Sequence, residues 1–137
     1  MATSNTKKIS TLIPRIILGL IYFVFGLNFF LHFIPNDAQP EGNAAAFLGG
    51  LFKAGYMFPM IKTIEVVAGA LLLAGLFVPL LLVMLMPITL NILLFHAVLE
   101  PTGPAIAMGT IMLLCQLYLA WVYRDQYKHL FIARSVV

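Results

Sequence analysis

Five polar side chains lie in the most apolar parts of this sequence and could do chemistry: Asn28, His32, Glu65, Asn91 and His96. Ionisable residues inside a membrane segment are rare and mark proton relays, ligand sites or ion paths. A carboxylic acid beside an imidazole can exchange protons near neutral pH. We therefore interpret Glu65, His96 and His32 as candidates for proton exchange, and Asn28 and Asn91 as candidates for ligand binding.

The composition predicts that these residues sit in a membrane. Of the 137 residues, 62% are hydrophobic and only 9% are charged, whereas about a quarter of a soluble domain is charged. Because a helix needs about 20 apolar residues to cross a bilayer, the chain has room for four such helices. We predict an all-α, polytopic membrane protein, a single four-transmembrane-helix bundle over residues 1–137.

Prolines and polar stretches divide the chain into these helices. We expect them at about residues 11–33, 59–78, 80–99 and 104–123, with a tight hairpin at Val78 and Pro79 and with Pro87 inside the third helix. The first apolar run is longer than a signal-peptide core, so we expect it to be a retained helix. In the first connection, the spacing of apolar residues in "NAAAFLGGLFKAGYMF" predicts a short amphipathic helix at the membrane surface.

Basic residues predict the orientation. They flank both ends of the chain, and the set is Lys7, Lys8, Arg15, Arg124, Lys128 and Arg134. Short basic segments stay on the cytoplasmic side, so both termini are predicted to be cytoplasmic and the first connection extracytoplasmic. The net charge of +3 is then a topology signal and gives no reason to invoke a nucleic-acid partner.

This topology places all five polar residues in the outward half of the bundle. We expect them to meet in a single outward-facing pocket. Between Gly69 and Met86, in contrast, the sequence contains no ionisable side chain. Transporters and channels usually have polar groups along their whole pathway, so permeation ranks below the other hypotheses. Small residues, among them Gly19, Gly26 and Gly109, are instead spaced for close helix packing.

Two segments, "GYMFPMIKTIEVVAG" and "FVPLLLVMLMPITLNILLFHAVLEPTG", carry a resemblance to a known family. Their pattern is a glutamate followed by spaced glycines, here Glu65, Gly69 and Gly75, and then a histidine that closes the third helix, here His96. The chain resembles the DoxX-like family of small four-helix bacterial membrane proteins from about Arg15 to Tyr127. In the first helix many members carry a lysine, where this chain has Asn28 and His32.

The resemblance implies a multi-pass protein of the bacterial inner membrane that is associated with redox chemistry. The family takes its name from a subunit of a thiosulfate:quinone oxidoreductase. We therefore expect a redox-associated subunit that holds a quinone-like or other small ligand at the five polar residues. Electrons would come from a redox partner protein or from other subunits of a complex. Whether the chain is itself an enzyme stays open.

The alternative interpretation is a non-enzymatic structural or assembly subunit whose polar cluster serves helix packing, with Glu65 bonded to Asn91, a histidine or Lys62. Glu65, His32 and His96 have ligand types that suit zinc or iron, but their spacing matches no metal motif, and we expect neither a metal nor a haem. Cys115 is the only cysteine, so the chain cannot run dithiol exchange by itself.

Overall fold

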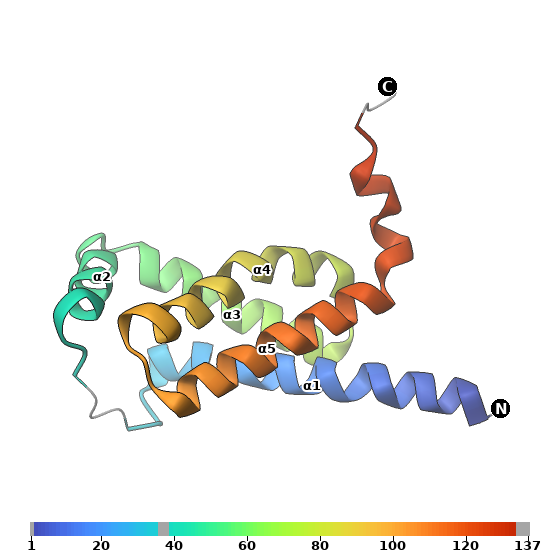
Figure 1. Ribbon diagram of the computed structural model, residues 1–137, viewed down its shortest axis with the longest axis horizontal. Coiled ribbons are helices and arrows are strands. Elements are labelled where there is room, and N and C mark those ends of the chain that lie inside the picture. Colours follow the sequence, from blue (N-terminus) through green and yellow to red (C-terminus); the bar gives the residue numbers. More distant parts are fainter. Residues whose placement is uncertain (1, 36–38, 134–137) are drawn as a thin grey trace.

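The computed structural model describes residues 2–35 and 39–133, and all of its regular structure is helical (Figure 1). The elements are α1 (Ala2–Leu31), α2 (Gly42–Lys53), α3 (Met57–Ala74), α4 (Val78–Leu94), the π-helix η1 (Phe95–Leu99), α5 (Gly103–Val122) and the 3₁₀-helix η2 (Arg124–Phe131). The predicted all-α fold class is confirmed.

Four helices are long and apolar enough to cross a membrane: Asn5–Leu31, Met57–Ala74, Val78–Leu99 and Gly103–Val122. Less than a third of the residues in each of these helices are buried inside the bundle. The remaining apolar surface faces outward, as expected where lipid surrounds the helices. The protein is an integral membrane protein.

The long helices run side by side along one axis, with α1 packed most extensively against α3 and α4 against α5 (Figure 1). The start of α1 and the helix η2 lie at one end of this bundle, whereas α2 lies across the other end. This arrangement agrees with an even number of spans and with a short helix in the first connection. The side of the membrane on which the termini lie stays a prediction.

The hairpin between α3 and α4 forms earlier than expected. Helix α3 ends at Ala74, and Gly75 follows in the left-handed region with a φ of 75°. There the amide of Leu76 donates to the Leu71 carbonyl at 2.9 Å. Pro79 therefore lies in the first turn of α4, where its missing N–H would have had no partner in the helix.

The contact between α1 and α3 depends on glycines. A Cβ at Gly69 would lie 2.5 Å from the amide nitrogen of Phe23 and 2.9 Å from the carbonyl oxygen of Gly19, so the two backbones nearly touch. A Cβ at Gly26 would lie 2.8 Å from the side chain of Val66. This close approach confirms the packing role predicted for Gly19 and Gly26, and it fixes the depth of Glu65 relative to α1.

We predict that Gly69→Ala destabilises the bundle by about 1–3 kcal/mol, because the added methyl group meets backbone atoms that cannot move aside without separating the helices. Unfolding of the protein in mixed micelles by sodium dodecyl sulfate, followed by circular dichroism, measures this change. Gly50→Ala on α2 is the matched control, since a Cβ there would meet nothing within 4 Å. Equal stability of the two variants would contradict the prediction.

Candidate functional site

One pocket of about 170 Å³ in the bundle is lined by both Glu65 and His96. It is lined from all four membrane helices and from η1 by Ile21, Tyr22, Phe25, Lys62, Glu65, Ile92, His96, Met108 and Met112. Most of these side chains are apolar, and a few convergent polar groups interrupt them. This composition is typical of a small-molecule site.

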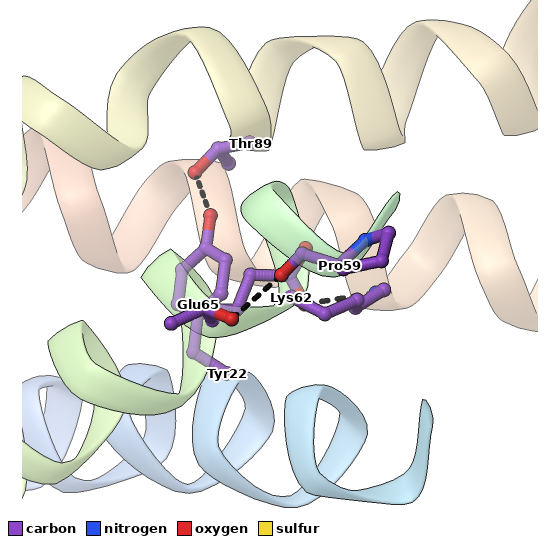
Figure 2. Close-up of polar contacts among 6 residues, drawn as sticks. Tyr22, Pro59, Lys62, Glu65 and Thr89 are labelled. Atoms are coloured by element: carbon purple, nitrogen blue, oxygen red, sulfur yellow. Dashed lines mark hydrogen bonds and ion pairs between the residues drawn. The ribbon is translucent and has the colours of Figure 1, made fainter. Parts of the chain in front are cut away.

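An ion pair forms the charged side of the pocket. The Lys62 ammonium donates to Oε2 of Glu65 at 2.8 Å, and both residues belong to α3, one turn apart (Figure 2). The Glu65 side chain is 3% exposed and that of Lys62 is 21% exposed. Because both partners lie on one helix, this pair does not connect α3 to its neighbours.

His96 also lines the pocket and belongs to the π-helix η1. Single π-turns are rare in proteins and are frequent at functional sites. The Nδ1 atom of His96 is buried and has no hydrogen-bond partner among the described residues. A buried polar atom without a partner is costly, so the fold carries an unsatisfied group beside the pocket.

His32 and Asn28 do not reach this pocket. Helix α1 ends at Leu31, and the exposed His32 follows it in the left-handed region with a φ of 52°. Oδ1 of Asn28 accepts a hydrogen bond from the amide of Ile34 at 2.7 Å. Asn28 therefore closes the end of its own helix, and His32 is part of the turn that follows.

Asn91 also lies away from the pocket. Its side chain is exposed on α4 and has no hydrogen-bond partner among the described residues. Residues five apart on an α-helix are rotated by about 140° from each other, so Asn91 and His96 face different sides. Of the five predicted residues, the structure brings together only Glu65 and His96.

A second polar cluster, which was not expected from the sequence, is buried in the bundle and shares Tyr22 with the pocket. The hydroxyls of Tyr22 on α1 and Thr89 on α4 are hydrogen-bonded (Figure 2), and Thr89 also donates to Oε1 of Gln116 on α5. The Gln116 amide then donates to the carbonyl oxygen of Leu82 at 2.6 Å. We call these side chains, Tyr22, Thr89 and Gln116, the three-helix network.

The sequence contains a signal that could have indicated Thr89. It precedes His96 by seven residues, a spacing that places two residues on nearly the same helix face. Ile92, which lies between them at a spacing of three, also lines the pocket. A helical projection of this segment would have placed Thr89 inside the bundle and Asn91 outside.

The polar residues of the pocket can bind polar atoms at the edge of a ring-sized molecule. Lys62 and His96 can donate hydrogen bonds to carbonyl or hydroxyl oxygens, and the carboxyl group of Glu65 can accept or release a proton. The volume is close to the roughly 150 Å³ of an apolar cavity that takes up benzene. Within the described part of the chain, no three His, Cys, Asp or Glu side chains lie close enough together to hold a metal ion.

Comparisons with known proteins gave no relatives: no family model matches the chain, and neither a curated protein nor a solved structure matches it.

We predict that Thr89→Val destabilises the protein by about 1–3 kcal/mol, because it leaves the Tyr22 hydroxyl and the Gln116 carbonyl oxygen buried without their partner. Unfolding in mixed micelles measures the change. Thr110→Val is the matched control, since the exposed Thr110 bonds only to the Ile106 carbonyl of its own helix. A loss of stability no larger than that of Thr110→Val would show that the network does not hold the helices together.

Proposed function

We propose that this membrane protein is a ligand-holding subunit of a redox system, and that its pocket takes the head group of a quinone-like molecule. The observation that carries the proposal is the meeting of the Lys62–Glu65 ion pair and His96 at a single, largely apolar pocket of ring size. A lipid-soluble ring with two polar oxygens matches both the walls of this pocket and its polar groups.

The chain's own residues would bind and orient the ring. The Lys62 ammonium and the His96 imidazole would donate to its oxygens, while Ile21, Phe25 and Met108 would contact its faces. Glu65, which accepts a hydrogen bond from Lys62, would exchange a proton with an oxygen of the ring. When bound, a quinone would supply the capacity to accept and release electrons and protons.

Electrons would be exchanged with a partner protein or with another subunit. The resemblance of the segments around Glu65 and His96 to the DoxX-like family supports this part of the proposal, because that family includes a subunit of a quinone-dependent oxidoreductase. The same resemblance and the basic residues at both ends support a place in the bacterial inner membrane with cytoplasmic termini.

In the alternative function, a purely structural subunit, the polar residues around Glu65 would connect neighbouring helices. The geometry assigns that connection to other residues. Glu65 is paired with Lys62 on its own helix, whereas the three-helix network connects α1, α4 and α5 by itself. The Lys62–Glu65 pair is therefore not needed for the connection between these three helices.

We predict that Glu65→Gln and His96→Gln each weaken the binding of decylubiquinone, a short-chain quinone, by about tenfold or more, because the first removes the carboxylate that pairs with Lys62 and the second replaces the imidazole by a differently shaped amide. Equilibrium binding to the protein in lipid nanodiscs measures this affinity. Native mass spectrometry of the same particles tests whether an endogenous quinone is retained by the wild type and lost from the variants.

Thr63→Val is the control for binding, since Thr63 is exposed on the same helix and bonds only to the carbonyl of Pro59. Circular dichroism checks that each variant is folded. Folded variants that bind the quinone as tightly as the wild type would refute the proposed site. If the wild type retains no quinone and does not bind decylubiquinone, the proposal that the ligand is a quinone would be refuted.

A further inference from the structure

The strongest unexplained feature outside the pocket is the amide of Asn91 on the outer side of α4. At 1.5 Å per residue, it lies about 20 Å along the helix from Val78 and about 12 Å from Leu99, the two ends of this span. Asn91 is exposed and has no partner among the described residues. Its short side chain therefore places an amide, with two donor hydrogens and an acceptor oxygen, in the hydrocarbon.

Two exposed threonines of the membrane helices, Thr63 and Thr110, are satisfied within their own helices. The hydroxyl of Thr63 donates to the Pro59 carbonyl at 2.6 Å, and that of Thr110 donates to the Ile106 carbonyl at 2.8 Å. Each hydroxyl is satisfied by the preceding turn of its own helix. An outward-facing amide in the middle of the lipid needs a partner from another molecule.

A backbone carbonyl on the same side of α4 also lacks a hydrogen-bond donor. Pro87 has no N–H, so the carbonyl of Val83 lacks its usual donor four residues later. Val83, Pro87 and Asn91 are spaced by four and form one stripe along the helix. All three are exposed, as are Leu90 and Leu94 beside them. We call this surface the α4 face.

We propose that the α4 face binds a second copy of this chain, with the two Asn91 amides hydrogen-bonded to each other. An amide is both donor and acceptor and is therefore complementary to itself. A two-fold axis along the membrane normal brings the same residue of two copies together at the same depth. Lipid tails cannot supply such a partner, and a different protein would need its own polar group at this level.

This dimer does not depend on the proposed quinone site. Asn91 does not line the pocket. The α4 face could therefore be occupied whether or not a ligand is bound. A failure of the dimer and a failure of the pocket are distinguishable.

Energy transfer between labelled copies in liposomes, measured over a range of protein-to-lipid ratios, tests the proposal. We expect the wild type to dimerise and Asn91→Leu to dimerise about tenfold more weakly, because the paired amides are lost. Thr110→Val, which changes an exposed polar residue on α5, should dimerise as the wild type does. A monomeric wild type, or an Asn91→Leu dimer of unchanged affinity, would overturn the proposal.

Cysteine cross-linking tests the geometry of the contact. In a Cys115→Ser background that keeps Asn91, Leu94→Cys on the α4 face should form a disulfide between two copies under mild oxidation, whereas Ile111→Cys on the exposed side of α5 should not. Cross-linking of Leu94→Cys only to a different protein would show that the α4 face binds another partner and would overturn the proposed dimer. Cross-linking that is equally efficient at both positions would indicate random collision and would also overturn it.

Discussion

The hydrogen bonds from Tyr22 through Thr89 to Gln116 are the interaction on which the rest of this bundle depends. Lipid gives helices no hydrophobic reason to associate, so packing and interhelical hydrogen bonds must hold them together. The three-helix network joins α1, α4 and α5 at fully buried side chains. The glycine contact then adds α3 to α1. These two devices together set the rotation and depth of every membrane helix.

The pocket can contain unshared charged groups because other residues hold the helices together. Since the network and the glycines join the helices, the Lys62–Glu65 pair can remain within α3 with its charges beside an open space. A buried ion pair is expensive to desolvate and adds little stability for that cost. Its position at a pocket that His96 of the π-turn also lines is consistent with the ligand-holding role we propose.

The sequence was sufficient for the fold class, because hydrophobicity and proline positions determine which segments can span a membrane. It also indicated that Glu65 and His96 lie at a similar level of the bundle, since the level follows from the position along a helix, and both residues line one pocket. It was not sufficient for the direction in which each side chain points. Asn28 and His32 lie at a suitable level, but the helix ends there and uses Asn28 to close itself.

The hydrogen bonds of Thr89 and Gln116 with other helices were not predicted, for a related reason. A threonine in an apolar helix can bond to its own backbone, as Thr89 does to the Leu85 carbonyl, and the type of residue does not indicate whether it also bonds to another helix. The hairpin was misplaced because Gly75 and Phe77 both adopt the left-handed conformation. Glycine does so readily, but nothing in the type of Phe77 indicates it.

The outward position of Asn91 is a consequence of the same network. Residues two apart on a helix point in nearly opposite directions, so α4 can turn only one of Thr89 and Asn91 inward. Thr89 has partners on two other helices, and a rotation that buried Asn91 would break both bonds. The monomer gains nothing from an amide in the lipid. The internal order of the bundle therefore creates the unsatisfied group on its surface, and a second copy of the same chain is the simplest molecule that can satisfy it.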